Sequence, residues 1–334
     1  MAQPITTPKR NIPDAAAKPT GAGTGAKPVA GIRQGAANTI PSGSRTVVAA
    51  TTNSIPTIPF TIQPLSDYVR WLKILIYGDY GSGKTRLAGS AVMVPNMRDV
   101  LFIDCEAGDL TIATEPEFHD VAIKHMDVIS VKTFSTLARI QEFLRAHCTY
   151  RDADNTQGLK QLEEKLMGSN YNPDTPPRTY RTAIIDSLTE AETYSMYQLL
   201  GVTDKTRLDE ETASPEWAEY KKNYSQILRL IRKFRDLPMH IIFTSGATYV
   251  QDDQKRMLWQ PSLSGKLAKQ CQGFMDVVTF AQVGQGENGK KVHTFQAQPS
   301  SKINAKCRFS NFKEMGWNNP TMQTILDSVG LDGS

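Results

Sequence analysis

Short apolar runs alternate with stretches of helical periodicity from about residue 60 onward. Apolar runs of roughly four to eight residues are typical of buried strands, and an apolar period near 3.6 residues is typical of helices that cover a sheet. We expect strands at 72–77, 100–104, 127–131, 181–186, 239–245, 276–282 and 291–298. We expect helices at 84–93, 135–148, 157–167, 188–200, 215–236 and 264–273. This alternation predicts one α/β domain over residues 59–334, with a mainly parallel sheet flanked by helices.

The longest predicted helix and the last two strands carry more specific patterns. In the 215–236 helix, large apolar residues recur at helical spacing, which predicts a face packed into the core. These residues are Trp217, Tyr220, Tyr224, Leu228, Ile231 and Phe234. A Gly-rich connection at 284–289 separates the last two strands, so we expect an antiparallel hairpin at the sheet edge.

Residues 1–58 are rich in Ala, Pro, Thr and Gly and lack any sustained apolar period. Such a segment buries too little apolar surface to offset its ordering entropy, so we expect a disordered tail. The tail contains six basic residues and one acidic residue, whereas the whole chain has a net charge of +4. The rest of the chain is therefore close to neutral. The tail is either a solubilising segment or a basic arm that contacts nucleic acid.

The composition limits the cellular compartment that we expect and the kinds of metal or disulfide site that the chain could form. No apolar run approaches the ~20 residues that a membrane-spanning helix needs, and the first residues contain no apolar signal segment. The four cysteines form no C-x-x-C pair, so neither a zinc site nor a disulfide framework is expected. We expect a cytoplasmic protein.

The most informative motif is G-x-x-x-x-G-K-T at residues 78–85, between a predicted strand and a predicted helix. This is the pattern of a phosphate-binding loop (P-loop), whose backbone N–H groups surround phosphate oxygens. The expected nucleotide contacts are Gly78, Asp79, Tyr80, Gly81, Ser82, Gly83, Lys84, Thr85 and Arg86. Lys84 should reach the β- and γ-phosphates, and Thr85 should offer its hydroxyl to Mg²⁺. ATP and Mg²⁺ are therefore the expected cofactors.

Polar side chains follow three of the other predicted strands. Asp186 ends an apolar strand and is the candidate metal carboxylate. Glu106 lies just beyond another strand and could polarise the water that attacks the γ-phosphate. Asp104 could assist the metal or cap the following turn. Ser245, or Thr244 beside it, could sense the γ-phosphate, because the carboxyl ends of parallel strands line the ligand crevice.

These runs resemble a known family. Val100–Ala107, with the sequence V-L-F-I-D-C-E-A, is similar to the second-strand motif of RecA-type recombinases, and this resemblance implies that Glu106 is the catalytic carboxylate. Residues 78–85, 184–190 and 235–244 together resemble phage P-loop proteins with a RecA-like, AAA-type core. Some of these are Sak-type single-strand annealing proteins. The resemblance covers roughly residues 70–315 and implies a homo-oligomeric ring or filament that acts on single-stranded DNA.

Two groups of basic residues could complete such a function. RecA-like ATPases place a pair of cations after a late strand, which reach the neighbouring subunit's nucleotide. Lys306 and Arg308 match this pattern, with Lys302 as a further candidate, although a solvated basic turn would look the same. The loop at 247–264 and the residues just after it combine cations with an aromatic ring, which suits single-stranded DNA. These candidates are Lys255, Arg256, Trp259, Lys266 and Lys269.

Two other functions remain open from the sequence. The nucleotide could act as an assembly switch without turnover. Alternatively, the basic residues of the 151–181 segment could form the lid of a small-molecule or nucleotide kinase; these are Arg151, Lys160, Lys165, Arg178 and Arg181. Fold analogy alone does not decide between such functions.

Overall fold

A sheet of nine strands in the order β11-β9-β8-β1-β5-β4-β2-β3, with β10 beside β8, forms the centre of the part that the structure describes. The computed structural model describes residues 71–168, 171–203, 205–251, 255–286 and 289–331. These residues all belong to one of the chain's two units, Gln63–Ser334. The predicted disordered tail at 1–58 lies outside the described residues, so this prediction stays untested.

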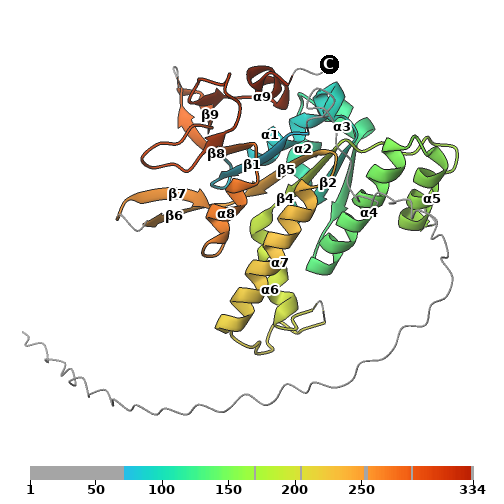
Figure 1. The fold of residues 1–334 in the computed structure, drawn as a ribbon, viewed down its shortest axis with the longest axis horizontal. Coiled ribbons are helices and arrows are strands. Elements are labelled where there is room, and N and C mark those ends of the chain that lie inside the picture. Colours follow the sequence, from blue (N-terminus) through green and yellow to red (C-terminus); the bar gives the residue numbers. More distant parts are fainter. Residues whose placement is uncertain (1–70, 169–170, 204, 252–254, 287–288, 332–334) are drawn as a thin grey trace, which may run out of the picture. The chain divides into compact units, whose positions relative to one another are not determined.

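Strands and helices alternate along the chain as the sequence predicts (Figure 1). The strands are β1 (Lys73–Gly78), β2 (Val100–Asp104), β3 (Met126–Ser130), β4 (Thr182–Asp186), β5 (His240–Ser245), β6 (Ala247–Gln251), β7 (Met257–Pro261), β8 (Val277–Gln285), β9 (Lys291–Gln296), β10 (Lys306–Cys307) and β11 (Gly316–Asn318). The helices are α1 (Lys84–Gly89), α2 (Asp109–Ala113), α3 (His119–His125), α4 (Phe134–Asp152), α5 (Thr156–Met167), α6 (Leu188–Leu199), α7 (Trp217–Arg235), α8 (Leu267–Gly273) and α9 (Met322–Val329).

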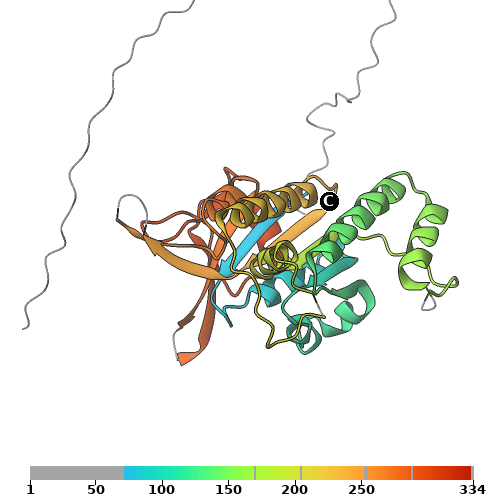
Figure 2. The same cartoon turned by 90° about the horizontal axis from the view of Figure 1, so that it is seen from below.

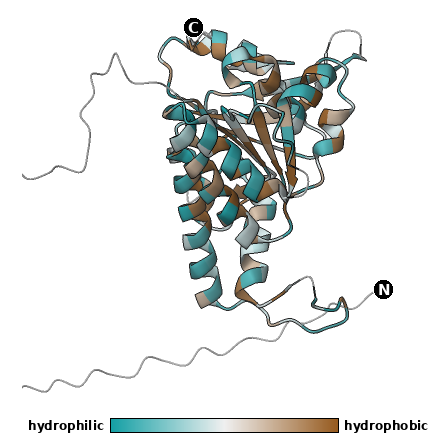
Figure 3. Ribbon diagram, turned by 90° about the vertical axis from the view of Figure 1, so that its right-hand side faces the viewer, coloured by the Kyte–Doolittle hydropathy of each residue, from teal (hydrophilic) through white to brown (hydrophobic). Residues whose placement is uncertain are grey.

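Both faces of the sheet are covered by helices (Figure 2), because alternate residues of each central strand point to opposite sides. In β1, Leu75 and Tyr77 join a core beneath α4, α6, α7 and α8. Ile74 and Ile76 join a second core beneath α1, α2, α3 and α9. The strands therefore form an apolar layer between mostly polar outer helix faces (Figure 3). The predicted α/β fold class, with a mainly parallel sheet between helices, is confirmed.

The pairing of the strands decides where the functional residues meet. β3, β2, β4, β5, β1 and β8 run parallel, so their carboxyl ends lie along one edge of the sheet. β8 and β9 pair in antiparallel fashion from Phe280↔Gln296 to Gln285↔Lys291, which confirms the predicted hairpin. The P-loop follows β1 and so lies at the carboxyl edge, where Gly78 is paired with Ala281 in the middle of β8.

Several elements differ from the sequence prediction. The first helix is α-helical only to Gly89 and continues as a 3₁₀ turn at Ser90–Met93, where the Ser90 hydroxyl donates to the Leu87 carbonyl. The helix expected from residue 264 begins at Leu267, after Gly265 with its positive φ of 55°. Elements that the sequence analysis missed are α2, α3, β6, β7, β10, β11 and α9.

The apolar stripe of α7 is only partly buried. Ile231 and Phe234 are fully buried, but Trp217 is 74% exposed and Tyr220 is 44% exposed. The prediction that the whole stripe packs into the core was wrong for its first two turns. The reason is geometric: α6 extends away from the carboxyl edge of the sheet, and α7 runs back along the sheet to the amino edge, where β5 begins, so the far ends of both helices extend past the strands (Figures 1 and 3). No described helix combines the length and the apolar character that crossing a bilayer would require.

Candidate nucleotide-binding site

The P-loop adopts a conformation that depends on its glycines. Gly81 and Gly83 have φ angles of 71° and 90°, a region that favours glycine. A Cβ at Gly78 would lie 2.2 Å from the Ala281 carbonyl oxygen, so the loop starts tightly against β8. The Ser82 hydroxyl donates to the Asp79 carbonyl at 2.7 Å and closes the turn. These contacts explain why the motif needs glycine at its first and sixth positions.

Lys84 reaches back across the loop. Its ammonium donates to the Gly78 carbonyl at 3.0 Å and to the Asp79 carbonyl at 2.9 Å. Burial lowers its pKa, an effect that nearby Asp186, Glu106 and Asp79 partly oppose. The cation therefore lies at the mouth of the loop, with carboxylates on β4 and just after β2 close enough to influence it.

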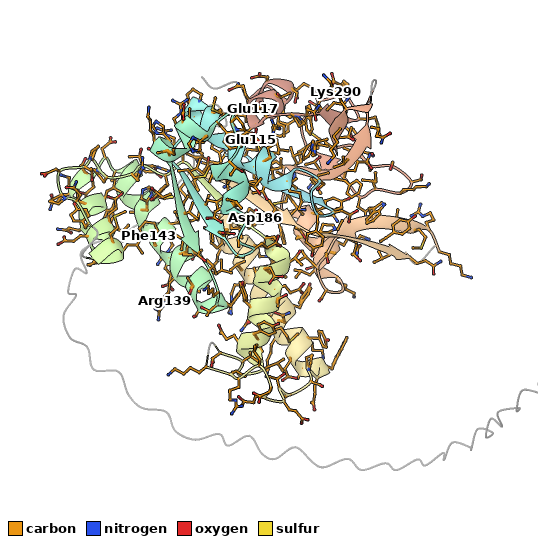
Figure 4. All side chains as sticks on the ribbon, turned by 180° about the vertical axis from the view of Figure 1, so that it is seen from behind. Glu115, Glu117, Arg139, Phe143, Asp186 and Lys290 are labelled. Atoms are coloured by element: carbon orange, nitrogen blue, oxygen red, sulfur yellow. The ribbon has the colours of Figure 1, made fainter. Side chains whose placement is uncertain are left out.

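Thr85 and Asp186 are in contact, as the metal prediction requires. The Thr85 hydroxyl donates to one carboxylate oxygen of Asp186 at 2.7 Å, and the Thr244 hydroxyl donates to the other. Asp186 is 1% exposed, and its position at the end of β4 is labelled in Figure 4. Burial raises its pKa, while the two hydroxyl donors and Lys84 act in the opposite direction. Burial has the larger effect on this pKa. A bound cation would act in the opposite direction, because it would stabilise the charged carboxylate.

Glu106 is positioned by the helix that follows Asp186. The Ser187 hydroxyl donates to the Glu106 carboxylate, and Ser187 is also the N-cap of α6. Partial desolvation raises the pKa of Glu106, and the Ser187 hydrogen bond partly offsets that rise. Asp104 instead accepts from the backbone N–H groups of Glu106 at 3.2 Å and Gly108 at 2.9 Å. Of its two predicted roles, the structure gives Asp104 the turn cap.

A cavity of about 420 Å³ opens beside Glu106 at the carboxyl ends of β2 and β3. Tyr80 of the P-loop, Lys132 and Glu190 line this cavity together with Glu106. The Tyr80 side chain is 94% exposed, and its predicted contact with the nucleotide stays a prediction. The cavity gives the catalytic candidate access to solvent, which water attack requires.

The residues present suit a magnesium nucleotide. Mg²⁺ prefers hard oxygen ligands, and the Thr85 hydroxyl and Asp186 carboxylate supply two neighbouring ones. A Cβ at Gly108 would lie 2.9 Å from the same Asp186 oxygen, so glycine keeps that side of the carboxylate open. The glycine-rich loop and Lys84 supply the phosphate contacts.

Two predicted nucleotide contacts have other partners. Arg86 forms ion pairs with Glu115 at 3.0 Å and Glu117 at 2.6 Å (Figure 4 labels both glutamates). Its guanidinium therefore joins α1 to the loop after α2. Ser245 is fully buried and shares a hydrogen bond of 3.1 Å with Thr189. Thr244, the alternative candidate, bonds Asp186 directly, so the polar group of β5 in this site is Thr244.

The predicted pair of cations at Lys306 and Arg308 has partners within the chain. The Lys306 ammonium donates to the carbonyls of Gln272 and Met275 at 3.2 and 2.9 Å. Arg308 pairs with Asp276 at 3.1 Å and donates to the Gly273 carbonyl. These groups precede β8, so the cations lie at the amino edge of the sheet, opposite this chain's own P-loop. Lys302 is exposed.

The predicted DNA contacts lie on and near the β6–β7 ribbon. Trp259 stacks on Phe280 with ring centroids 5.5 Å apart and packs on Tyr249 at 4.9 Å. Trp259 is thus packed against two rings of the domain and is partly exposed, so its predicted contact with a base stays a prediction. Lys255, Arg256, Lys266 and Lys269 are exposed, as are Tyr249 (43%) and Met257 (40%).

The arginines of the 151–181 segment do not form a lid over the P-loop. Arg151 donates to the carbonyls of Tyr180 and Pro238, at the starts of β4 and β5. Arg178 pairs with Asp127 near the start of β3. Both arginines therefore join loops at the amino edge of the sheet and give no support to a kinase lid. Of the other candidates, Lys160 donates to the Pro173 carbonyl at 3.2 Å, and Lys165 and Arg181 are exposed.

Two contacts of this site were missed by the sequence analysis. The pairing of Ser187 with Glu106 depends on β2 and β4 being neighbours, although the S-x-x-E pattern at 187–190 is a recognisable N-cap. His293 of β9 lies against the P-loop, with its Nδ1 3.0 Å from the Ser82 carbonyl oxygen. No local pattern could have indicated this second contact.

Comparison with known proteins identifies a family for the chain. No curated protein sequence matches the chain. Among the solved structures that match is the flagellar accessory protein FlaH from Methanocaldococcus jannaschii, with 12% identity and a TM-score of 0.35 over 74% of this chain and 84% of that one. The sequence model of an AAA domain matches residues 70–309, more than half of the chain. This match includes the P-loop, Glu106 and Asp186, and the chain therefore belongs to the AAA domain family of P-loop nucleoside triphosphatases.

Proposed function

We propose that the protein is a Mg²⁺-dependent ATPase. The observation that carries this proposal is the convergence of four groups from three strand ends: Lys84, Thr85, Asp186 and Glu106. Lys84 would bind the transferring phosphoryl oxygens, and Thr85 with Asp186 would hold the metal. When bound, Mg²⁺ would neutralise charge on the β- and γ-phosphates. Glu106 would take a proton from the attacking water, which reaches it through the 420 Å³ cavity.

We further propose that turnover serves a role on single-stranded DNA in phage recombination or annealing, as the resemblance to Sak-type proteins implies. The exposed cations beside Tyr249 and Met257 on the β6–β7 ribbon support this role, since cations follow the phosphate backbone and exposed rings stack on bases. We also propose a homo-oligomer. In that assembly Lys306 and Arg308 would reach a neighbouring nucleotide only after releasing the carbonyls and the carboxylate that they now bind.

Phosphate release and sedimentation together test these proposals. Purified protein should release phosphate from ATP with Mg²⁺ and stop when EDTA is added, and single-stranded oligonucleotides should accelerate the release. Sedimentation with and without nucleotide reports the oligomer. ATP binding without phosphate release would contradict the ATPase and support a nucleotide switch. If oligonucleotides neither bind to the protein nor change the rate of phosphate release, this result would contradict the DNA role alone.

The hydrogen bond from Ser187 to Glu106 predicts a specific pH dependence. A general base works only when deprotonated, and Glu106 has a raised pKa, so kcat/KM should fall on the acid side at a higher pH than for an ordinary glutamate. Ser187→Ala removes a donor that lowers this pKa, so the acid limb should move to still higher pH while the plateau rate changes about twofold or less.

The matched control is Ser195→Ala on the same helix, where the hydroxyl donates to Gln226 at 2.7 Å and does not contact Glu106. Its pH profile should overlay that of the wild-type protein. An acid limb that stays in place in Ser187→Ala would show that the titrating base is not Glu106.

A further inference from the structure

His293 contacts the P-loop from a strand 211 residues further along the chain than Ser82. Its Nδ1 lies 3.0 Å from the Ser82 carbonyl oxygen. A carbonyl oxygen can only accept, so Nδ1 carries the proton and donates. A Cβ built on Gly83 would lie 2.9 Å from this same nitrogen, which shows how closely the imidazole packs on the loop. The contact therefore joins β9 to the peptide between Ser82 and Gly83, just before Lys84.

The position of His293 is itself fixed by the segment after β11. The His293 backbone N–H donates to the Asn319 side-chain oxygen at 2.8 Å, and the Asn319 N–H donates to the His293 carbonyl at 2.7 Å. Three residues later, the Met322 N–H donates to the Ser90 hydroxyl at 2.9 Å, just after α1. The segment from Asn319 to Met322 is thus linked to the P-loop through His293 and to the end of α1 through Ser90.

We propose that His293 is a positioning residue for the phosphate cradle, an inference that rests on the proposed nucleotide site. The peptide between Ser82 and Gly83 is planar and trans, so its carbonyl and its N–H point in opposite directions. Because His293 binds the carbonyl from the β9 side, the Gly83 N–H points away from β9, into the cradle. Gly83 has no side chain to restrict its φ, which is 90° here, so an anchor on the carbonyl helps to hold this peptide in one orientation.

The ligand that this contact serves is the polyphosphate of the nucleotide. His293 bonds only the backbone in this contact, and the group that it orients is an N–H donor of the kind that binds phosphate oxygens. Loss of the anchor should therefore weaken ATP and inorganic tripolyphosphate by the same factor. A role in recognising the base or ribose would weaken ATP alone.

The experiment compares two replacements by calorimetry on the full chain. His293→Phe keeps a planar ring but has no donor, so both ligands should bind about three- to tenfold more weakly, as expected for one lost hydrogen bond. His293→Asn places an amide nitrogen where Nδ1 lies and should restore both affinities to within about twofold of wild type. Melting temperatures of both variants are measured alongside.

Three outcomes would overturn the inference: wild-type affinity in His293→Phe, weakening of ATP but not tripolyphosphate, or equal weakening in His293→Asn. If His293→Phe does not fold, Asn319→Gly tests the same chain of contacts, because it removes the acceptor that holds the His293 backbone and suits the positive φ of 45° at that position. It should weaken both ligands together, and unchanged affinity would overturn the inference. Wild-type protein that binds neither ligand would contradict the proposed function itself.

Discussion

Lys84→Ala is expected to reduce ATP turnover by at least about 100-fold, the usual effect of removing one group that stabilises transition-state charge. The Lys84 ammonium is the cation that the structure places at the mouth of the P-loop, where it spans the Gly78 and Asp79 carbonyls. Without it, the charge on the transferring phosphoryl group meets two nearby carboxylates, Asp186 and Glu106, with no compensating lysine. Steady-state phosphate release and calorimetric ATP affinity are the measurements.

Lys313→Ala is the control for this variant, because Lys313 is an exposed lysine between β10 and β11 with no proposed role, and its loss changes the net charge equally. It should leave turnover within about twofold of wild type. Turnover that survives in Lys84→Ala would mean that the P-loop lysine does not contact the reacting phosphate. Affinity for ATP should also fall in Lys84→Ala, since a point charge at this position binds the nucleotide as well as the transition state.

The sequence predicted the centre of the fold well, because the central strands are buried on both faces. The strands that carry the P-loop, Glu106 and Asp186 all end within about one residue of their expected positions. Their polar end residues could therefore be assigned to one edge of the sheet from the sequence alone. The same reasoning did not place β6, β7 or α9, because each is only five to eight residues long and such short apolar patterns are ambiguous.

The differences between the local patterns and the structure have a common cause: a short sequence window contains the residue types but not their surroundings. The α7 stripe has helical spacing throughout, yet Trp217 extends past the end of the sheet, where it stays exposed with the Lys221 ammonium over its ring. Trp259 has cationic neighbours in sequence, but its ring is stacked on Phe280. Lys306 belongs to a pair that resembles a trans-acting motif, but α8 supplies its carbonyl partners. In each case sheet order and helix length, which no short window contains, decide the role.

Glu106→Gln should reduce kcat by about 10²- to 10⁴-fold, the range expected when a general base is removed. The amide has the same shape and can still accept the Ser187 hydrogen bond, so the turn after β2 should be preserved. It cannot take a proton from water. ATP affinity should stay within about threefold of wild type, since the P-loop, Thr85 and Asp186 are unchanged. Single-turnover phosphate release and equilibrium ATP binding separate these two effects.

Glu190→Gln is the matched control, because Glu190 lines the same cavity and its substitution removes the same charge. Its kcat should change by about threefold or less, which would attribute the loss in Glu106→Gln to one carboxylate and not to the charge of the cavity. Equal losses in the two variants would contradict that assignment. A wild-type rate in Glu106→Gln would exclude Glu106 as the base and leave Asp186 as the carboxylate at the centre of the site. Because Asp186 already accepts hydrogen bonds from Thr85 and Thr244, it would then have to serve both the metal and the water.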